Sequence, residues 1–290
     1  MSLNEKFIYM NEKEEQIEFS ALSPFFLTKI SGIAGINNII TSSDSTSDGS
    51  VYISSRFSNR NIVLQGKLKR ENRDINRDKL IKVLNPKLKG KLIYSNKDTN
   101  VIKYIDCRIE KSPDPVKDFI STFQISFICN DPYWKDMTST KFNIARWVGD
   151  FRFPHFIIPG GITMGHRQPS LIVNAVNNGD IKTGMIIEFI AHGTLKNPGL
   201  FNVNTRESIK INKSMDPGEV ITIDTNFGRK KIESSLNGVK TNILNYLDLA
   251  GGGSTFLQLD TGDNLLRYNA DENLSNLEVN IYFNPGYLGV

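Results

Sequence analysis

The stretch TFQISFICNDPYW, residues 122–134, combines a strand-like alternation with an abrupt end. Every second residue from Phe123 to Cys129 is apolar, and this period of two predicts a β-strand with one buried face. The strand is followed by a turn-forming acid, a proline and two aromatic residues, which are Asp131, Pro132, Tyr133 and Trp134. Proline cannot continue a strand ladder, and the aromatic pair suits either a packed domain exit or a subunit interface.

The sequence before this stretch predicts further strands and one helix. We expect strands over 61–68, 91–95 and 101–110, an amphipathic helix over about 73–84, and a polar loop over 42–50. Pro86 supplies the stop signal for the helix, because proline lacks the backbone donor that a helix interior needs.

The pattern of apolar and turn-forming residues changes after Trp134. From about residue 170, short apolar runs alternate with turn sequences such as NNGD (177–180) and DPGE (216–219), which predicts an antiparallel sandwich. One short helix is expected over TNILNYLDLA (241–250), with Gly251 as its cap. The chain has 290 residues, so we expect two domains, 1–134 and 135–290.

Composition excludes several classes of protein. Hydrophobic residues make up 39% of the chain, so disorder of the whole chain is not expected. Cys107 and Cys129 both lie in strand-like contexts, which indicates buried free thiols and not a disulfide framework. The N-terminus lacks the apolar run of a signal peptide, and no stretch has the length of a membrane helix. We therefore expect synthesis and assembly in a reducing cytoplasm.

The sequence offers little catalytic chemistry. It lacks the nucleophile-elbow, phosphate-loop and zinc-protease motifs, and its three histidines lie far apart without a second ligand at metal spacing. Asp224 and Asp260 each end a strand and would form a glycosidase pair if they lay about 5–10 Å apart. Aspartates at strand ends more often form turns. We expect no catalytic, cofactor-binding or metal-binding residues.

The segment 67–91 is the most basic part of the chain. It carries ten Lys and Arg residues and three acidic ones, and its N-terminal part contains Lys67, Lys69, Arg70, Arg73 and Arg77. Direct binding of nucleic acid is not favoured, because the segment has no aromatic side chain on which a base would stack. A solvated face, or a face that meets an acidic partner, remains the expectation.

The strand that ends in Cys-x-Asp-Pro-Tyr-Trp, about 130 residues into the chain, resembles the distal tail proteins of long-tailed, siphophage-type bacteriophages. The second half agrees with this resemblance through NNGDIKTGMIIEFIAHGTLKNPGLFN (177–202), STFLQLDTGDNLLRY (254–268) and the terminal YLGV (287–290). The resemblance covers most of the chain and is loosest over residues 1–60.

The resemblance implies a mainly β virion protein without catalytic residues. Residues 1–134 would form a β-sandwich or barrel-like ring domain with one helix, completed by a last strand from 280–290. Residues 135–290 would form a galectin-like β-sandwich. Six copies would form a ring that joins the tail tube or tape measure protein to a baseplate hub or receptor-binding protein. The protein would be assembled in the bacterial host cytoplasm and would then reside in the virion tail.

Two other functions stay open at the level of sequence. A two-domain lectin-like protein would use the second sandwich to bind carbohydrate. No aromatic and polar sugar platform is recognisable there, since Trp134 and Trp147 both precede the short strands that begin at about residue 170. A glycosidase based on Asp224 and Asp260 is the weaker alternative. Oligomeric state distinguishes the ring protein from the lectin, and glycan turnover distinguishes the glycosidase from both.

Overall fold

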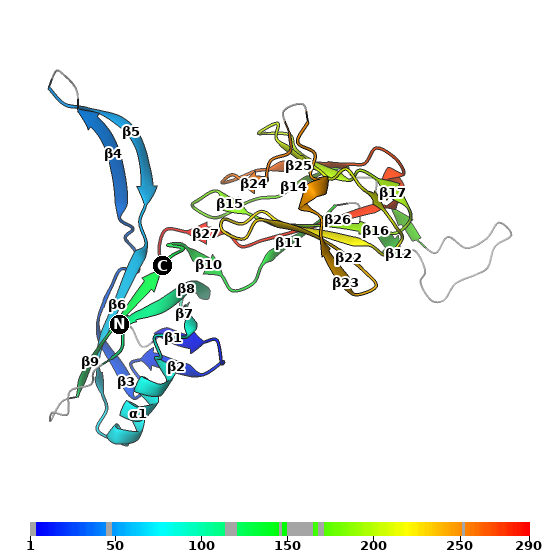
Figure 1. Cartoon of the computed structure of the whole chain (residues 1–290). Helices are drawn as coiled ribbons and strands as arrows, with labels where there is room; N and C mark the ends of the chain where they lie inside the picture. The colour runs from blue at the N-terminus through cyan, green and yellow to red at the C-terminus, as the bar shows by residue number, and fades with distance from the viewer. Residues whose placement is uncertain are drawn as a thin grey trace. The chain divides into compact units, whose positions relative to one another are not determined.

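The computed structural model of the chain describes residues 4–44, 48–113, 121–144, 147–149, 165–167, 171–250 and 253–290. The chain divides into two compact units (Figure 1). The first unit contains Met1–Met137 together with Gly286–Val290, and the second contains Thr138–Pro285. Residues 280–285 therefore lie in the second unit, and only the last five residues return to the first.

The first unit is a closed, barrel-like sheet of seven strands. In sheet order these are β8 (Val101–Lys111), β7 (Lys89–Asn96), β1 (Glu5–Asn11), β2 (Gln16–Ser20), β3 (Phe25–Ser31), β6 (Arg60–Leu68) and β9 (Thr122–Cys129). β9 pairs back onto β8 and closes the barrel. Two short strands, β10 (Trp134–Asp136) and β27 (Gly286–Tyr287), extend the sheet beside β8. A closed barrel leaves few unpaired strand edges.

The barrel core is rich in aromatic side chains. Those that are buried are Phe7, Tyr9, Phe19, Phe25, Tyr94, Phe123, Phe127 and Trp134. The predicted strand 122–129 is confirmed as β9, and its alternate residues Phe123, Ile125 and Phe127 face this core. Cys107 and Cys129 are both buried free thiols, as expected, and burial raises the pKa of Cys129 to about 12.

The predicted helix is confirmed as α1 (Arg73–Val83). It follows β6 and buries Leu80 and Val83 against the barrel. Its last turn is closed by the Leu84 N–H, which donates to the Leu80 carbonyl, two residues before Pro86. Among the described residues, no helix has both the length and the apolar character needed to cross a membrane.

A two-stranded hairpin, β4 (Asn38–Asp44) and β5 (Ser50–Phe57), lies between β3 and β6. Figure 1 shows it reaching away from the barrel strands. The expected polar loop over 42–50 is wrong for residues 42–44 and 50, which pair within this hairpin; residues 45–47 lie outside the described part of the chain. All residues of both strands are exposed, so polar residues occur on either face. The alternation of apolar and polar residues that is typical of a half-buried strand is therefore absent.

The second unit contains two main sheets. The six-stranded sheet has the order β11 (Thr140–Ile144), β26 (Leu277–Phe283), β16 (Ile186–Ala191), β21 (Val220–Asp224), β22 (Lys231–Leu236) and β23 (Val239–Asn242). The four-stranded sheet has the order β14 (Ile172–Asn174), β25 (Leu265–Asn269), β18 (Gly199–Asn202) and β19 (Ser208–Lys210). Short pairs join β15 (Thr183–Gly184) to β24 (Gln258–Leu259), β17 (Leu195–Lys196) to β20 (Ser214–Met215), and β12 (Trp147–Gly149) to β13 (Gly165–Arg167).

Both main sheets of the second unit contribute to one hydrophobic core. Phe189, Ile223 and Val279 come from the six-stranded sheet, while Leu200 and Leu266 come from the four-stranded sheet. All five side chains are fully buried. This shared core makes the unit an antiparallel sandwich, as the spacing of turns in the sequence predicted.

The expected helix over 241–250 is wrong. Residues 241 and 242 end β23, and the only helical residues in this stretch form one 3-10 turn, η1 (Leu244–Tyr246). Tertiary pairing prevents a longer helix, because the Ile243 N–H donates to the Ile232 carbonyl and Leu247 forms a bridge with Ile211. Gly251, the predicted cap, lies outside the described residues. A second 3-10 turn, η2 (Leu274–Asn276), precedes β26.

Candidate interaction site at the base of the hairpin

Residues 131–134, which follow β9 closely, form a tight corner. The Asp131 side chain accepts a hydrogen bond from the Tyr133 backbone N–H at 3.4 Å and pairs with the Lys135 ammonium. Trp134 is completely buried, and its Nε1–H donates to the Ile33 carbonyl at 3.0 Å. The corner is therefore fixed to the segment that leads into the hairpin, since a buried indole requires such a partner.

Arg60 sits at the centre of this region with only 2% of its surface exposed. Its Nε donates to the Pro132 carbonyl at 2.7 Å, its Nη1 to the Gly32 and Ile33 carbonyls at 2.9 Å, and its Nη2 to the Leu288 carbonyl at 2.5 Å. Burial lowers the pKa of the guanidinium, but arginine stays protonated in proteins. One side chain thus joins the hairpin base, the corner and the C-terminus.

The C-terminal residues complete the same region. β27 pairs with β10, which places Tyr287 opposite Trp134. The Tyr287 hydroxyl donates to Asp136 at 3.0 Å, and the Lys103 ammonium lies 3.4 Å from the centre of the Tyr287 ring. A Cβ added at Gly289 would stand 3.0 Å from the Ala34 Cα, so the last residues lie directly against the hairpin base.

We call residues 32–34, Arg60, 131–134 and 286–290 the hairpin anchor. β5 also contacts it, since the Phe57 ring meets the Tyr133 ring edge-on at 6.2 Å between centroids. The predicted group Asp131, Pro132, Tyr133 and Trp134 therefore lies at the junction of β9, β10 and the hairpin. Sequence reasoning did not identify Arg60; the only signal was a lone arginine at the start of an apolar strand.

The hairpin arm, which is β4 and β5, carries large apolar side chains that are open to solvent. They are Ile39, Ile40, Val51, Tyr52, Ile53 and Phe57. Ile40 is 64% exposed and Tyr52 is 62% exposed. Val51, Tyr52 and Ile53 are consecutive, so each face of the hairpin carries apolar side chains among its polar ones. Exposed apolar surfaces of this kind are typical of sites that contact another molecule.

The predicted basic face lies along one continuous segment. Lys67 is on β6, Lys69 and Arg70 follow that strand, and Arg73 and Arg77 lie in α1. The Lys69 ammonium donates to the Leu22 carbonyl at 2.8 Å, and Arg77 pairs with Asp78 at 3.8 Å. Part of this positive charge thus has partners within the chain. The face stays a predicted contact for an acidic partner.

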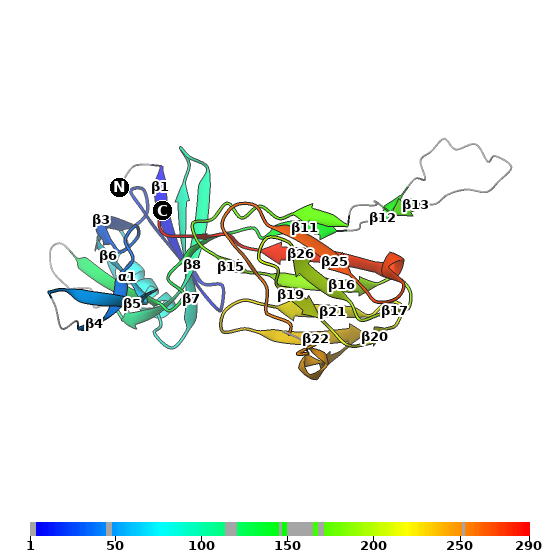
Figure 2. The same ribbon diagram turned by 90° about the horizontal axis from the view of Figure 1, so that it is seen from above.

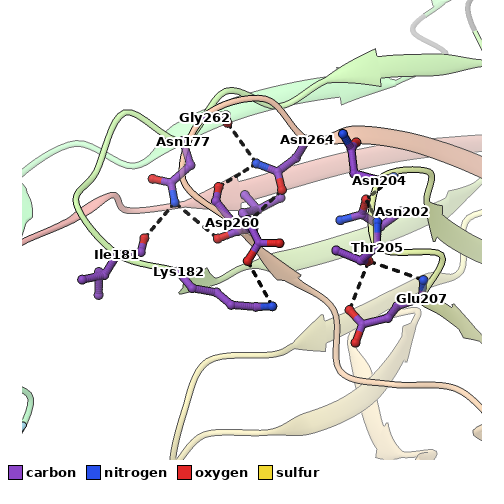
Figure 3. Close-up of polar contacts among 11 residues, drawn as sticks. Asn177, Ile181, Lys182, Asn202, Asn204, Thr205, Glu207, Asp260, Gly262 and Asn264 are labelled. Carbon is purple, nitrogen blue, oxygen red and sulfur yellow. Dashed lines mark hydrogen bonds and ion pairs between the residues drawn. The ribbon is translucent and has the colours of Figure 1, made fainter. Parts of the chain in front are cut away.

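In the second unit, two buried asparagines organise the loops that the sequence singled out (Figure 3). Asn177, in the NNGD turn, donates to the carbonyls of Ile181 and Leu259. Asn264 donates to the carbonyls of Ala175, Asp260 and Gly262. These bonds hold the loop around residue 178 to the loop around residue 262, so the motif has a structural role here.

The two acids of the glycosidase hypothesis also have local partners. Asp260 pairs with Lys182 at 3.1 Å (Figure 3). Asp224 accepts hydrogen bonds from the backbone and the side chain of Asn226 at 2.9 and 2.7 Å. Such contacts are those of turn-forming aspartates. In the described part of the chain, no three His, Cys, Asp or Glu side chains gather as a metal site would require.

Two family models match the chain, one in each half. Residues 13–129 match the phage tail protein RIFT-related domain, and residues 178–287 match the C-terminal domain of the siphovirus-type tail component. The chain belongs to the siphophage distal tail protein family. The first match covers most of the barrel and the second covers most of the sandwich, and both describe a component of a phage tail.

Solved structures share the fold. The crystal structure of SPP1 Dit (gp 19.1), described as a paradigm of hub adsorption apparatus in Gram-positive infecting phages, matches with a TM-score of 0.68 and 11% identity, covering 97% of this chain and 98% of that one. A chain of the phage p2 baseplate in its activated conformation with Sr matches with a TM-score of 0.51 and 12% identity, covering 96% and 98%. No curated protein matches the sequence.

Proposed function

We propose that this tail protein forms a homohexameric ring at the tail tip, where it joins the tail tube to the baseplate or receptor-binding assembly. The tail tube or tape measure protein would contact one side of the ring, and a baseplate hub or receptor-binding protein would contact the other. The first unit would build the ring, and the second unit would form a separate galectin-like sandwich. Membership of the family and the similarity to solved structures of a hub protein and a baseplate support this proposal.

The exposed apolar surface of the hairpin arm is the observation that most directly supports ring formation. An isolated two-stranded hairpin is only marginally stable in water. This one also exposes six large apolar side chains, each worth about 1.5–3 kcal/mol when fully buried. A ring uses a head-to-tail contact, in which an arm of one copy meets a different surface of the next copy. The arm has the form and chemistry that such a contact requires.

The hairpin anchor gives the arm a fixed direction. Arg60 ties both strands that lead into the arm to the corner and to the C-terminus. A fixed arm loses little conformational entropy on binding, which favours assembly. We therefore assign Trp134 and Arg60 to positioning the arm, since both bond the segment at its base.

Light scattering at several concentrations tests the proposal. The variant Ile40→Thr, Val51→Thr, Ile53→Thr keeps strand propensity and removes apolar contact. We expect the wild-type chain to reach the mass of six copies at high concentration, and the triple variant to stay monomeric with an unchanged melting temperature. The matched control is Val239→Thr with Leu249→Thr, two exposed apolar residues of the second unit, which should assemble normally.

Two results would contradict the proposal. One is a triple variant that assembles as well as the wild type. The other is an arrangement of this chain without six-fold symmetry in electron micrographs of assembled tails.

A further inference from the structure

The outer face of the six-stranded sheet carries a row of polar side chains. The strand pairings place Asn143 opposite Asn280, Asn280 opposite Glu188, Glu188 opposite Thr222, and Thr222 opposite Glu233. Figure 2 shows their strands β11, β26, β16, β21 and β22 side by side. With strands about 4.8 Å apart, the row spans about 19 Å.

The neighbours of these residues along each strand show which face the row occupies. Phe189, Ile221, Ile232 and Val279 are fully buried in the sandwich core. Successive side chains of a strand point to opposite faces, so the row points away from that core. Asn143 is exposed, and Glu188, Thr222 and Glu233 are partly exposed.

Asn280 is the exception within the row. Only 4% of its surface is exposed, and its carbonyl oxygen has no hydrogen-bond partner within the described residues. A buried acceptor without a partner is costly, and such groups in native proteins call for an explanation. Asn280 lies between Asn143 and Glu188 in the row. Its acceptor atom is itself buried, so a rotation of the Asn280 side chain would bring it to a donor from a bound molecule.

The chemistry of the row indicates what that molecule is. Two amides and a hydroxyl both donate and accept, while Glu188 and Glu233 accept hydrogen bonds and repel anions. Glu233 is already paired with Lys231 at 2.8 Å, which reduces the attraction for a cation. Beside the row, Tyr282 and Ile186 form an opposed pair that offers apolar surface, and the Lys141 ammonium lies 5.2 Å from the centre of the Tyr282 ring.

We propose that this face binds a neutral carbohydrate along the row Asn143, Asn280, Glu188, Thr222 and Glu233. Sugar hydroxyls supply the donor that Asn280 lacks and also bond the two carboxylates. The carbon skeleton of the sugar packs on Tyr282 and Ile186. Carbohydrate binding goes beyond ring formation and does not depend on it, since the whole row belongs to the second unit.

The proposal is tested with the full chain by saturation-transfer NMR and calorimetry against maltotetraose, cellotetraose and chitotetraose. A tetrasaccharide of hyaluronan serves as the anionic comparison. We expect at least one neutral tetrasaccharide to bind with a Kd of about 0.1–1 mM. The anionic compound should bind at least about tenfold more weakly, because of Glu188 and Glu233.

Asn280→Leu is the decisive variant. It removes the acceptor and keeps the volume, so binding should fall at least about tenfold while the melting temperature stays equal or rises. A merely structural asparagine would give the opposite pattern. Thr222→Val, which removes one hydroxyl and keeps the shape, provides a second variant if Asn280→Leu does not fold. The exposed Asn212 supplies the matched control Asn212→Leu, which should bind normally.

The proposal is overturned if none of the three neutral tetrasaccharides binds at about 10 mM. It is also overturned if the anionic tetrasaccharide binds as well as the neutral ones, or if Asn280→Leu and Thr222→Val both bind normally. None of these outcomes bears on the mass of the assembled protein, so failure of this proposal is distinguishable from failure of the ring.

Discussion

Trp134 shows how one residue at a strand end serves folding first. Its side chain is completely buried and its indole N–H has a partner, Ile33. We expect Trp134→Ala to destabilise the first unit by about 3–5 kcal/mol, as truncation of a buried tryptophan usually does. Thermal melts followed by circular dichroism measure this loss. A melting temperature that hardly changes while assembly fails would instead make Trp134 an interface residue.

Arg60 is a second residue whose role depends on geometry. Three of its nitrogens donate to four carbonyls on three separate segments of the chain. Lysine keeps the charge but presents one nitrogen, so Arg60→Lys should destabilise the first unit almost as much as Arg60→Met, by about 2–4 kcal/mol each. Urea denaturation of both variants measures these losses. A lysine variant as stable as the wild type would show that the positive charge at position 60 is enough to stabilise the first unit.

At the scale of elements, the helices and strands that could be predicted from the sequence are those with one buried face. The helix over 73–84 and the strand over 122–129 each have one buried face, and this asymmetry produces the periodicity that predicts them. The hairpin arm has no buried face, so residues 42–44 looked like loop. The stretch 241–250 has helical spacing, yet its backbone groups pair with neighbouring strands, and tertiary pairing overrode local preference.

The turn between β20 and β21 gives a prediction about pH. Burial alone would raise the pKa of Glu219, but hydrogen bonds from Lys213, Ser234 and the Asp216 backbone lower it overall. A lowered pKa in the folded state adds stability that is present above the unfolded value of about 4.5 and is lost as the pH falls through the lower folded value.

Glu219→Gln tests that turn, because glutamine cannot ionise. We expect the variant to be less stable than the wild type at pH 7, with a gap that narrows below about pH 4.5. Guanidinium denaturation of the second unit at pH 7 and at about pH 3 measures the gap. A gap that is constant across this range would show that the carboxylate charge contributes nothing.

At the scale of the whole molecule, the hairpin anchor lay beyond sequence reasoning. It joins Arg60 to Leu288, which are 228 positions apart, and no periodicity carries such a contact. The corner at 131–134 was recognisable because its turn chemistry is local. The polar row on the second unit was missed for a similar reason, since Asn143, Glu188 and Asn280 come from three strands that only the sheet brings together.

The division into two units predicts how fragments behave. Thr138–Pro285 is continuous and encloses its own core, so a fragment 138–285 should fold alone as a β-sandwich. A fragment 1–137 lacks the strand that pairs with β10 and the carbonyl that Arg60 bonds at Leu288. Joining residues 286–290 to it through a short Gly-Ser linker should raise its melting temperature.

Arg60→Met in the joined fragment provides the control, because it removes the bond to the added segment. We expect the gain from residues 286–290 to shrink in this variant, while the pairing of Trp134 with Tyr287 preserves part of it. Fragment 1–137 is melted with and without the added segment, once with Arg60 and once with Arg60→Met. These four measurements form a complete double-mutant cycle. A joined fragment no more stable than 1–137 alone would mean that the C-terminal strand only rests on the barrel and does not hold the hairpin anchor together.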